Sequence, residues 1–183
     1  ISREKPGKKE KFPTISILTC TYNGEGTIER CLQGLFMQDY PLDKIEWIIA
    51  DGGSKDKTVE IIKKWQQKYP KIIKFYINKT RFSDGRGKGY DLFSRKATKE
   101  LIWFMDQDNI LVQKQWLKNM TKILIENKEI AAVQSRMIIP EKGSLVDKYL
   151  NAIGIEDPFA IHYSLNSQII LNPKKFKFIK KGN

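Results

Sequence analysis

The chain has 183 residues, of which 40% are hydrophobic and 11% aromatic, so it can form one domain with a substantial core, and its composition excludes a disordered protein. No apolar run approaches the roughly 20 residues that a helix needs to cross a bilayer, so the sequence predicts no transmembrane helix. The net charge of +12 invites a nucleic-acid interpretation, but neither a helix-turn-helix signature nor a basic ladder interleaved with aromatic residues is present, and we expect no nucleic-acid partner.

A basic leader comes first, followed by a strand and a helix. We expect residues 1–13 to form a flexible leader that Pro13 ends, and residues 1–11 carry a charge of +3. Residues 15–19 predict a short apolar strand. Apolar residues then recur at helical spacing, and Thr27 is the expected N-cap of this helix. These apolar residues are Ile28, Cys31, Leu32, Leu35 and Phe36.

Strands and helices continue to alternate along the chain. Further strands are predicted at residues 45–50, 72–77, 101–105 and 131–139. Three further helices are expected: one carries Val59, Ile62 and Trp65, one occupies part of residues 87–98, and one carries Leu117, Met120 and Leu124. This alternation argues for an α/β protein with a mostly parallel sheet and helices on both faces. The expected domain covers residues 14–140. Residues 141–183 end in a basic tail, with +5 at residues 172–183, which could favour phosphates or an anionic membrane surface.

Polar clusters directly follow three of the predicted strands, at residues 20–23, 51–54 and 106–108. In a parallel sheet these strand ends lie at one edge, so residues remote in sequence converge there. Asp106 and Asp108 would repel each other unless a cation or hydrogen-bond donors compensate. A divalent Mg²⁺ or Mn²⁺ ion, with phosphate oxygens completing its shell, is the natural compensation. The alternative is ordinary polar turn chemistry after each strand.

Each cluster has a role if the ligand is a nucleoside diphosphate. Tyr22 offers an aromatic face on which a base can stack, or is a half-buried surface ring. Asp51 offers an acceptor for an imide N–H, which uracil and guanine possess, or caps a turn. Residues 52–53 are glycines that permit a tight turn and close approach of the backbone. The carboxylate pair would then hold the ribose and the metal.

Two segments together resemble a family-two glycosyltransferase. Residues 17–58 contain Ile-Leu-Thr-Cys-Thr-Tyr-Asn, Met-Gln-Asp-Tyr-Pro and Ile-Ile-Ala-Asp-Gly-Gly-Ser-Lys-Asp-Lys-Thr, and residues 97–108 are similar to the family's segment leading into its D-x-D motif. The resemblance covers roughly residues 14–125. It implies the GT-A fold, which is Rossmann-like, and transfer of a sugar from a nucleoside-diphosphate sugar to a hydroxyl acceptor. The implied reaction is a metal-assisted inverting displacement with Mn²⁺ or Mg²⁺, with UDP as the expected nucleotide and GDP as the alternative.

The resemblance also implies roles for individual residues. A nucleoside pocket is implied at Thr21, Tyr22, Asn23 and Glu25, a base contact at Asp51, a ribose and sugar contact at Asp106, and metal ligation at Asp108 with Asp106 beside it. The chain departs from the family at Cys20, where proline is usual, and at residues 89–91, where many members have Ala-Arg-Asn. A basic contact to the diphosphate must then come from Arg81, Arg86 or Lys88. Lys88 is favoured because its glycine neighbours let the backbone approach the phosphates, and the alternative is a solvated basic loop.

The general base of an inverting transfer is usually a carboxylate. In the resembled family it sits in a later acidic motif, and this chain stops about where the strand before that motif would begin. We therefore expect a truncated enzyme that holds the donor site and lacks the general base, in which residues 141–183 begin an incomplete acceptor-side region. Asp157 is the candidate base within the chain, and His162 is more readily a packed or surface residue.

Partners and location follow from the same expectations. The donor is a nucleotide sugar, and the acceptor is an unidentified saccharide or lipid-linked molecule. Cys20 and Cys31 do not have the spacing of metal ligands, and the chain has no secretory signal, which together favour a location in the cytoplasm. A peripheral contact at the cytosolic face of a membrane would come through parts absent from this chain.

Two alternatives stay open. A sugar-nucleotide pyrophosphorylase should have a glycine-rich loop after the first strand, for which residues 21–25 are a poor substitute, and a non-catalytic module would bind nucleotides or phosphate-rich surfaces through the basic tails.

Overall fold

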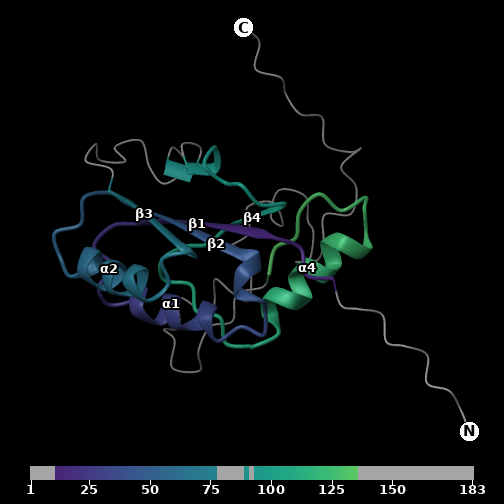
Figure 1. The fold of residues 1–183 in the computed structure, drawn as a ribbon, viewed down its shortest axis with the longest axis horizontal. Coiled ribbons are helices and arrows are strands. Elements are labelled where there is room, and N and C mark those ends of the chain that lie inside the picture. Colours follow the sequence, from purple (N-terminus) through teal and green to yellow (C-terminus); the bar gives the residue numbers. More distant parts are fainter. Residues whose placement is uncertain (1–10, 78–88, 91–92, 136–183) are drawn as a thin grey trace, which may run out of the picture. The chain divides into compact units, whose positions relative to one another are not determined.

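The protein is described by a computed structural model, which covers residues 11–77, 89–90 and 93–135. In these residues four strands form one parallel sheet with the order β3-β2-β1-β4 (Figure 1). The strands are β1 (Ile15–Thr21), β2 (Ile45–Asp51), β3 (Ile73–Ile77) and β4 (Leu101–Phe104). Because all four run in the same direction, their carboxyl ends meet at one edge of the sheet.

The two central strands are buried on both faces. Every residue of β1 and of β2 is buried, and the strands pair in register from Ile15 with Ile45 to Thr21 with Asp51. Continuous runs of apolar and β-branched residues are what a strand covered on both faces requires. The outer strands β3 and β4 are partly exposed, and β4 pairs with β1 through residues such as Leu18 and Phe104.

Helices cover both faces of the sheet. Helix α1 (Ile28–Phe36) and helix α2 (Thr58–Lys68) lie on one face, and a short 3₁₀ helix (Leu42–Lys44) leads into β2 (Figure 1). On the other face, residues 89–90 and 93–94 are helical, and Phe93 packs against Leu18, Ile48 and Ala50. The predicted α/β class with helices on both faces is therefore confirmed.

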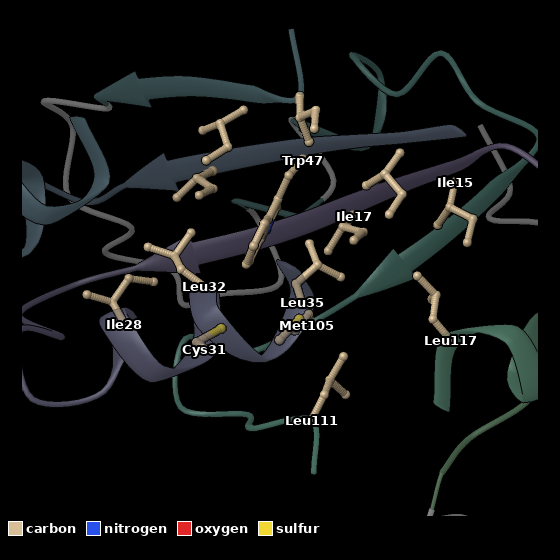
Figure 2. Close-up of a cluster of buried hydrophobic side chains, with 14 of the residues drawn as sticks. Ile15, Ile17, Ile28, Cys31, Leu32, Leu35, Trp47, Met105, Leu111 and Leu117 are labelled. Carbon is tan, nitrogen blue, oxygen red and sulfur yellow. The ribbon is translucent and has the colours of Figure 1, made fainter. Parts of the chain in front are cut away.

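The larger core lies between the sheet and helix α1. Ile28, Leu32 and Leu35 of α1 point towards Ile17 and Trp47 of the sheet, and all five are fully buried (Figure 2). Burial of one such leucine or isoleucine stabilises the fold by about 1.5–3 kcal/mol. This packing fixes α1, and with it the residues that enter the helix from the carboxyl end of β1.

Helix α1 begins differently from the expectation. Thr27 precedes the first helical residue, but its hydroxyl does not cap the helix and instead donates to the Gly24 carbonyl at 3.3 Å. The N–H groups of Thr27 and Ile28 donate to the same carbonyl at 3.0 and 2.9 Å. Thr27 therefore occupies the predicted N-cap position, but the acceptor there is the Gly24 carbonyl of the backbone turn rather than the Thr27 side chain.

The chain divides into two compact units, residues 1–121 and 122–183. The sheet, α1, α2 and the first part of α4 (Trp116–Glu126) belong to the first unit. Residues 131–135, part of the strand predicted at 131–139, have no regular structure and pair with no described strand, so that prediction was wrong for these residues. The described helices include none that is long and apolar enough to cross a bilayer.

Candidate functional site

The three polar clusters lie together at the carboxyl edge of the sheet, where β1, β2 and β4 end. Hydrogen bonds link residues 22–25 to residues 54–58 on one side and to Gln107 on the other. The parallel register explains the meeting, since Thr21 and Asp51 are paired neighbours at the ends of their strands. The convergence expected from the sequence is therefore what the structure shows.

Asp51 is a fully buried carboxylate that organises the turn after β2. Its exposed fraction is 0%. Oδ1 accepts the N–H groups of Gly53 and Ser54 at 2.9 and 2.8 Å, and Oδ2 accepts the hydroxyls of Thr21 and Ser54 at 3.0 and 2.5 Å. Gly53 has a φ of +89°, a conformation that glycine adopts without strain. In this arrangement a nucleotide base could reach Asp51 only by displacing one of these donors.

Asn23 and Glu25 clasp the loop after β1 to the loop after β2. Each residue bonds through its main-chain N–H and through its side chain, so the two loops are joined reciprocally. The N–H groups of Asn23 and Glu25 donate to Ser54 Oγ at 2.8 Å and Asp56 Oδ2 at 3.0 Å, while Asn23 Oδ1 and Glu25 Oε2 accept the N–H groups of Lys55 and Lys57, both at 2.9 Å. Between them, the Gly24 N–H donates to Thr58 Oγ1 at 2.7 Å. The clasp fixes residues 22–25 as one rigid edge of the site.

Tyr22 presents its side chain at this edge. The residue is 46% exposed, whereas its neighbour Thr21 is buried. Its main-chain N–H donates to Gln107 Oε1 at 3.0 Å, and its carbonyl accepts Gln107 Nε2 at 3.3 Å. An exposed aromatic ring on a firmly held backbone is suited to stack on a planar ligand.

Asp106 and Asp108 stand on the segment that continues from β4. Asp106 is partly buried and accepts the Tyr90 hydroxyl at its Oδ1, at 2.9 Å, while Asp108 is exposed. Burial, together with the negative charges of Asp108 and Asp106, raises the pKa of the Cys31 thiol to about 12, so both carboxylates act on the same buried thiol. The Cys31 thiol, which donates to the Asp106 carbonyl at 3.7 Å, therefore stays protonated.

The two carboxylates would suit an ion whose other ligands come from a bound substrate or from water. Within residues 11–77, 89–90 and 93–135, no group of three or more His, Cys, Asp or Glu side chains could hold a metal by itself. Mg²⁺ and Mn²⁺ take oxygen ligands, and Mg²⁺ in particular is commonly bound by one or two carboxylates together with substrate phosphates and water. Asp106 and Asp108 meet that requirement, with Asp108 the more accessible of the two.

The segment after the carboxylates is held against α1. A Cβ added to Gly34 would stand 3.1 Å from the Leu111 nitrogen, a tight contact that would require the segment to shift by a few tenths of an ångström. Gln38 Nε2 donates to the Gln113 carbonyl at 2.9 Å, and Gln38 Oε1 accepts the Leu117 N–H at 3.0 Å. The main chain that carries Asp106 and Asp108 is thus fixed at both ends.

Sequence reasoning missed several residues of the site. Tyr90 appeared only as a departure from the family pattern, and Gln107 only as the middle residue of the motif. Burial and the charge of Asp106 raise the pKa of Tyr90, so its hydroxyl stays a hydrogen-bond donor. Ser54 and Asp56 act through the loop clasp, for which residue spacing gives no signal. Other predicted site residues lie outside the described residues: Arg81, Arg86, Lys88, Asp157 and His162.

The chain is similar in sequence to known glycosyltransferases. The model of the family "Glycosyl transferase family 2" matches residues 16–180. The dolichyl N-acetyl-α-D-glucosaminyl phosphate 3-β-D-2,3-diacetamido-2,3-dideoxy-β-D-glucuronosyltransferase of Methanococcus voltae is 46% identical over 68 residues, which are 37% of this chain and 21% of that protein. The poly(ribitol-phosphate) β-N-acetylglucosaminyltransferase TarS of Staphylococcus aureus is 30% identical over 113 residues, or 61% of this chain and 19% of that protein. The chain thus spans about a fifth of the length of these relatives.

Solved structures show the same fold. The mannosyltransferase PcManGT of Pyrobaculum calidifontis, in complex with GDP-Man and Mn²⁺, matches with a TM-score of 0.63 and 27% identity over 71% of this chain and 37% of that chain. Residues 1–349 of S. aureus TarS in complex with UDP-GlcNAc match with a TM-score of 0.57 and 27% identity over 69% of this chain and 37% of that chain. The sheet has the GT-A fold, and with a family model that covers residues 16–180, the chain belongs to glycosyl transferase family 2.

Proposed function

We propose that this chain is the donor-binding part of a glycosyltransferase that moves a sugar from a nucleoside-diphosphate sugar to a hydroxyl acceptor by inverting displacement. The observation that carries the proposal is the meeting of Tyr22, the Asp51 turn and the Asp106–Asp108 pair at one edge of a parallel sheet. Neighbours of the same fold were solved with UDP-GlcNAc and with GDP-Man, which supports either nucleotide as the donor's carrier. UDP is the proposed nucleotide, as the family resemblance implies, and GDP is the alternative.

Different residues of the site would contact different parts of the donor. The Tyr22 ring stacks on the base, and residues 21–25 form the nucleoside side of the pocket, with Thr21, Asn23 and Glu25 in the roles that the resemblance implies. Asp51 shapes the turn that faces the base. It contacts the imide N–H of the base only if the base displaces one of the hydrogen-bond donors that the protein supplies to Asp51. Asp106 lies towards the ribose and sugar, and Lys88 is the proposed basic contact to the diphosphate.

Asp108, with Asp106 beside it, would hold a Mn²⁺ or Mg²⁺ ion. When bound, such an ion stabilises the departing diphosphate as a Lewis acid. Tyr90 keeps Asp106 oriented through its 2.9 Å hydrogen bond. The general base stays unassigned, and Asp157 is the candidate for it within the chain, on its residue type alone.

For the acceptor and the cellular location of the enzyme, only a general class is proposed. A saccharide or lipid-linked hydroxyl is the proposed acceptor, and the proposed location is the cytoplasm, at the cytosolic face of a membrane if the basic tails contact anionic lipid. The cysteines at positions 20 and 31 are buried and not joined in a disulfide, which suits a reducing compartment.

A thermal-shift panel with UDP, GDP and Mn²⁺ tests the function. One nucleotide is expected to raise the melting temperature of the wild-type chain when Mn²⁺ is present, and the effect of the metal is expected to vanish in Asp108→Ala. Asp43→Ala, which removes an exposed carboxylate from the 3₁₀ helix, is the matched control and should behave as wild type. Unchanged metal dependence in Asp108→Ala would refute the metal assignment. Salt-sensitive binding of nucleic acid without preference for UDP would favour the non-catalytic alternative.

A further inference from the structure

Gln107 connects the two halves of the proposed donor site. It lies between Asp106 and Asp108, yet its side chain points back to the loop after β1. Its Oε1 accepts the Tyr22 N–H at 3.0 Å and its Nε2 donates to the Tyr22 carbonyl at 3.3 Å. Both polar atoms of one side chain thus bind both main-chain groups of one residue, and only this orientation of the amide can satisfy them.

The space for this amide depends on Gly24. A Cβ added there would stand 2.5 Å from Gln107 Oε1 and 2.7 Å from its Cδ, closer than real Cβ atoms approach. Gly24 does not have the positive φ that Gly53 has, so an added Cβ would disturb the Gln107 amide rather than the backbone conformation. Two independent observations, a pair of hydrogen bonds and a steric fit, therefore identify the same contact.

The contact completes the support of Tyr22. On the α2 side, Asn23 and Glu25 already fix the loop to residues 54–57. On the β4 side, the described structure ties Tyr22 to the carboxylate segment through Gln107. Without that tie, the pairing of β1 with β4, which the described structure carries as far as Leu18 and Met105, would be left to relate the loop to Asp106 and Asp108.

We propose that Gln107 is a positioning residue that holds the base-stacking ring of Tyr22 at a fixed separation from the two carboxylates, and so couples metal binding to nucleotide binding. The inference rests on the proposed function, since a nucleoside diphosphate would have to span both parts. Holding the two contact points in place before binding lowers the entropic cost of engaging them together. The amide also does this without a third negative charge between the carboxylates.

The test compares the affinity of the 183-residue chain for UDP and GDP with and without Mn²⁺, by calorimetric titration. The dissociation constant measured without Mn²⁺, divided by that measured with Mn²⁺, gives a ratio that reports the coupling between metal and nucleotide. We expect this ratio to fall by roughly 10-fold in Gln107→Ala, while Gln67→Ala, an exposed glutamine of α2, keeps the wild-type ratio. A purely structural role would weaken UDP binding equally with and without Mn²⁺.

Gly24→Ala provides a second route to the same contact. Its new methyl group should displace the Gln107 amide and lower the coupling ratio as Gln107→Ala does. In the Gln107→Ala background the methyl group meets no amide, so Gly24→Ala should then cost little further stability, a non-additive result expected of residues in contact. An unchanged coupling ratio in both single variants, with wild type still bound by UDP or GDP, would overturn this inference alone. Failure of the wild-type chain to bind either nucleotide would overturn the proposed function and this inference with it.

Discussion

At the scale of single residues, the site combines side chains that face a ligand with side chains that hold the loops in place. Tyr22 is exposed, whereas Asp51 is fully buried and accepts four hydrogen bonds from its own chain. The sequence predicted the position of Asp51 from its place after an apolar strand. It could not predict the partners, because Ser54 and Thr21 become donors only once the turn and the strand pairing exist.

The two roles of Asp51 can be separated by substitution. Asp51→Ala should lower the free energy of unfolding by about 3 kcal/mol or more, because hydrogen bonds to charged groups contribute about 1.5–3 kcal/mol and buried donors lose their acceptor. Asp51→Asn should cost less, since its oxygen can accept the N–H groups of Gly53 and Ser54 while its amide donates to the hydroxyls of Thr21 and Ser54. Urea denaturation measures both. A residue that served only as a base contact would leave stability unchanged in Asp51→Ala and lower nucleotide affinity alone.

Gln107 shows why part of the site stayed hidden from sequence reasoning. Asp106 and Asp108 attract notice because two charges at a strand end need an explanation. Gln107 is neutral and its partner Tyr22 lies 85 positions away. Its role depends on the register of β1 and β4 and on the space above Gly24, neither of which residue spacing reveals.

At the scale of elements, the strands were the most predictable part of the fold. Continuous apolar runs located β1 and β2 closely, because strands buried on both faces need such residues along their whole length. The prediction at 131–139 was wrong for residues 131–135, since apolar composition does not supply a pairing partner. At α1, the periodicity of the apolar residues located the helix, but the acceptor at its start is the Gly24 carbonyl rather than the Thr27 hydroxyl.

The amino-terminal part of the sheet is joined by a buried carboxylate, Glu46 of β2. Its Oε1 accepts the Ser16 hydroxyl at 2.5 Å and the Thr98 N–H at 2.6 Å, and its Oε2 accepts Lys74 Nζ at 2.5 Å. These bonds connect β1, β2, β3 and the residues before β4. Burial acts to raise the pKa of Glu46, but Lys74, Ser16 and Thr98 together outweigh it and lower the pKa to about 2.

The Glu46 network predicts sensitivity to acid. Because the pKa of Glu46 is lower in the folded chain than its ordinary value of 4.5, the stabilisation is complete above about pH 4.5 and is lost as the pH falls towards 2. The full contribution is of the order of 3 kcal/mol. Urea denaturation between pH 6 and pH 3 should show a steeper loss of stability in wild type than in Glu46→Gln. Glu60→Gln, at an exposed position of α2, should follow wild type, and parallel pH profiles for wild type and Glu46→Gln would contradict the assignment.

At the scale of the whole molecule, the hydrogen-bond network that joins the strands and the proposed donor site lie at opposite edges of the parallel sheet. Glu46 joins the strands near their amino ends, while Tyr22, Asp51 and Asp106 meet at the carboxyl ends. The family resemblance and the GT-A fold were confirmed by the family model and by the solved neighbours. The domain boundary at residue 140, the diphosphate contact at Lys88 and the base at Asp157 stay predictions, because they concern residues outside those described or roles that require a bound donor.

The most direct test of the account is to locate the metal by NMR in the presence of UDP. Mn²⁺ is paramagnetic and broadens the amide signals of nearby residues, and Mg²⁺ serves as the diamagnetic reference. Since β1 and β2 each run for seven residues, about 20 Å, the two edges of the sheet are well separated. We predict the strongest broadening at residues 106–109, weaker broadening at residues 22–24, and the least at Ile15 and Ile45. Strongest broadening at the amino ends of the strands or along α2 would contradict a donor site at the carboxyl edge.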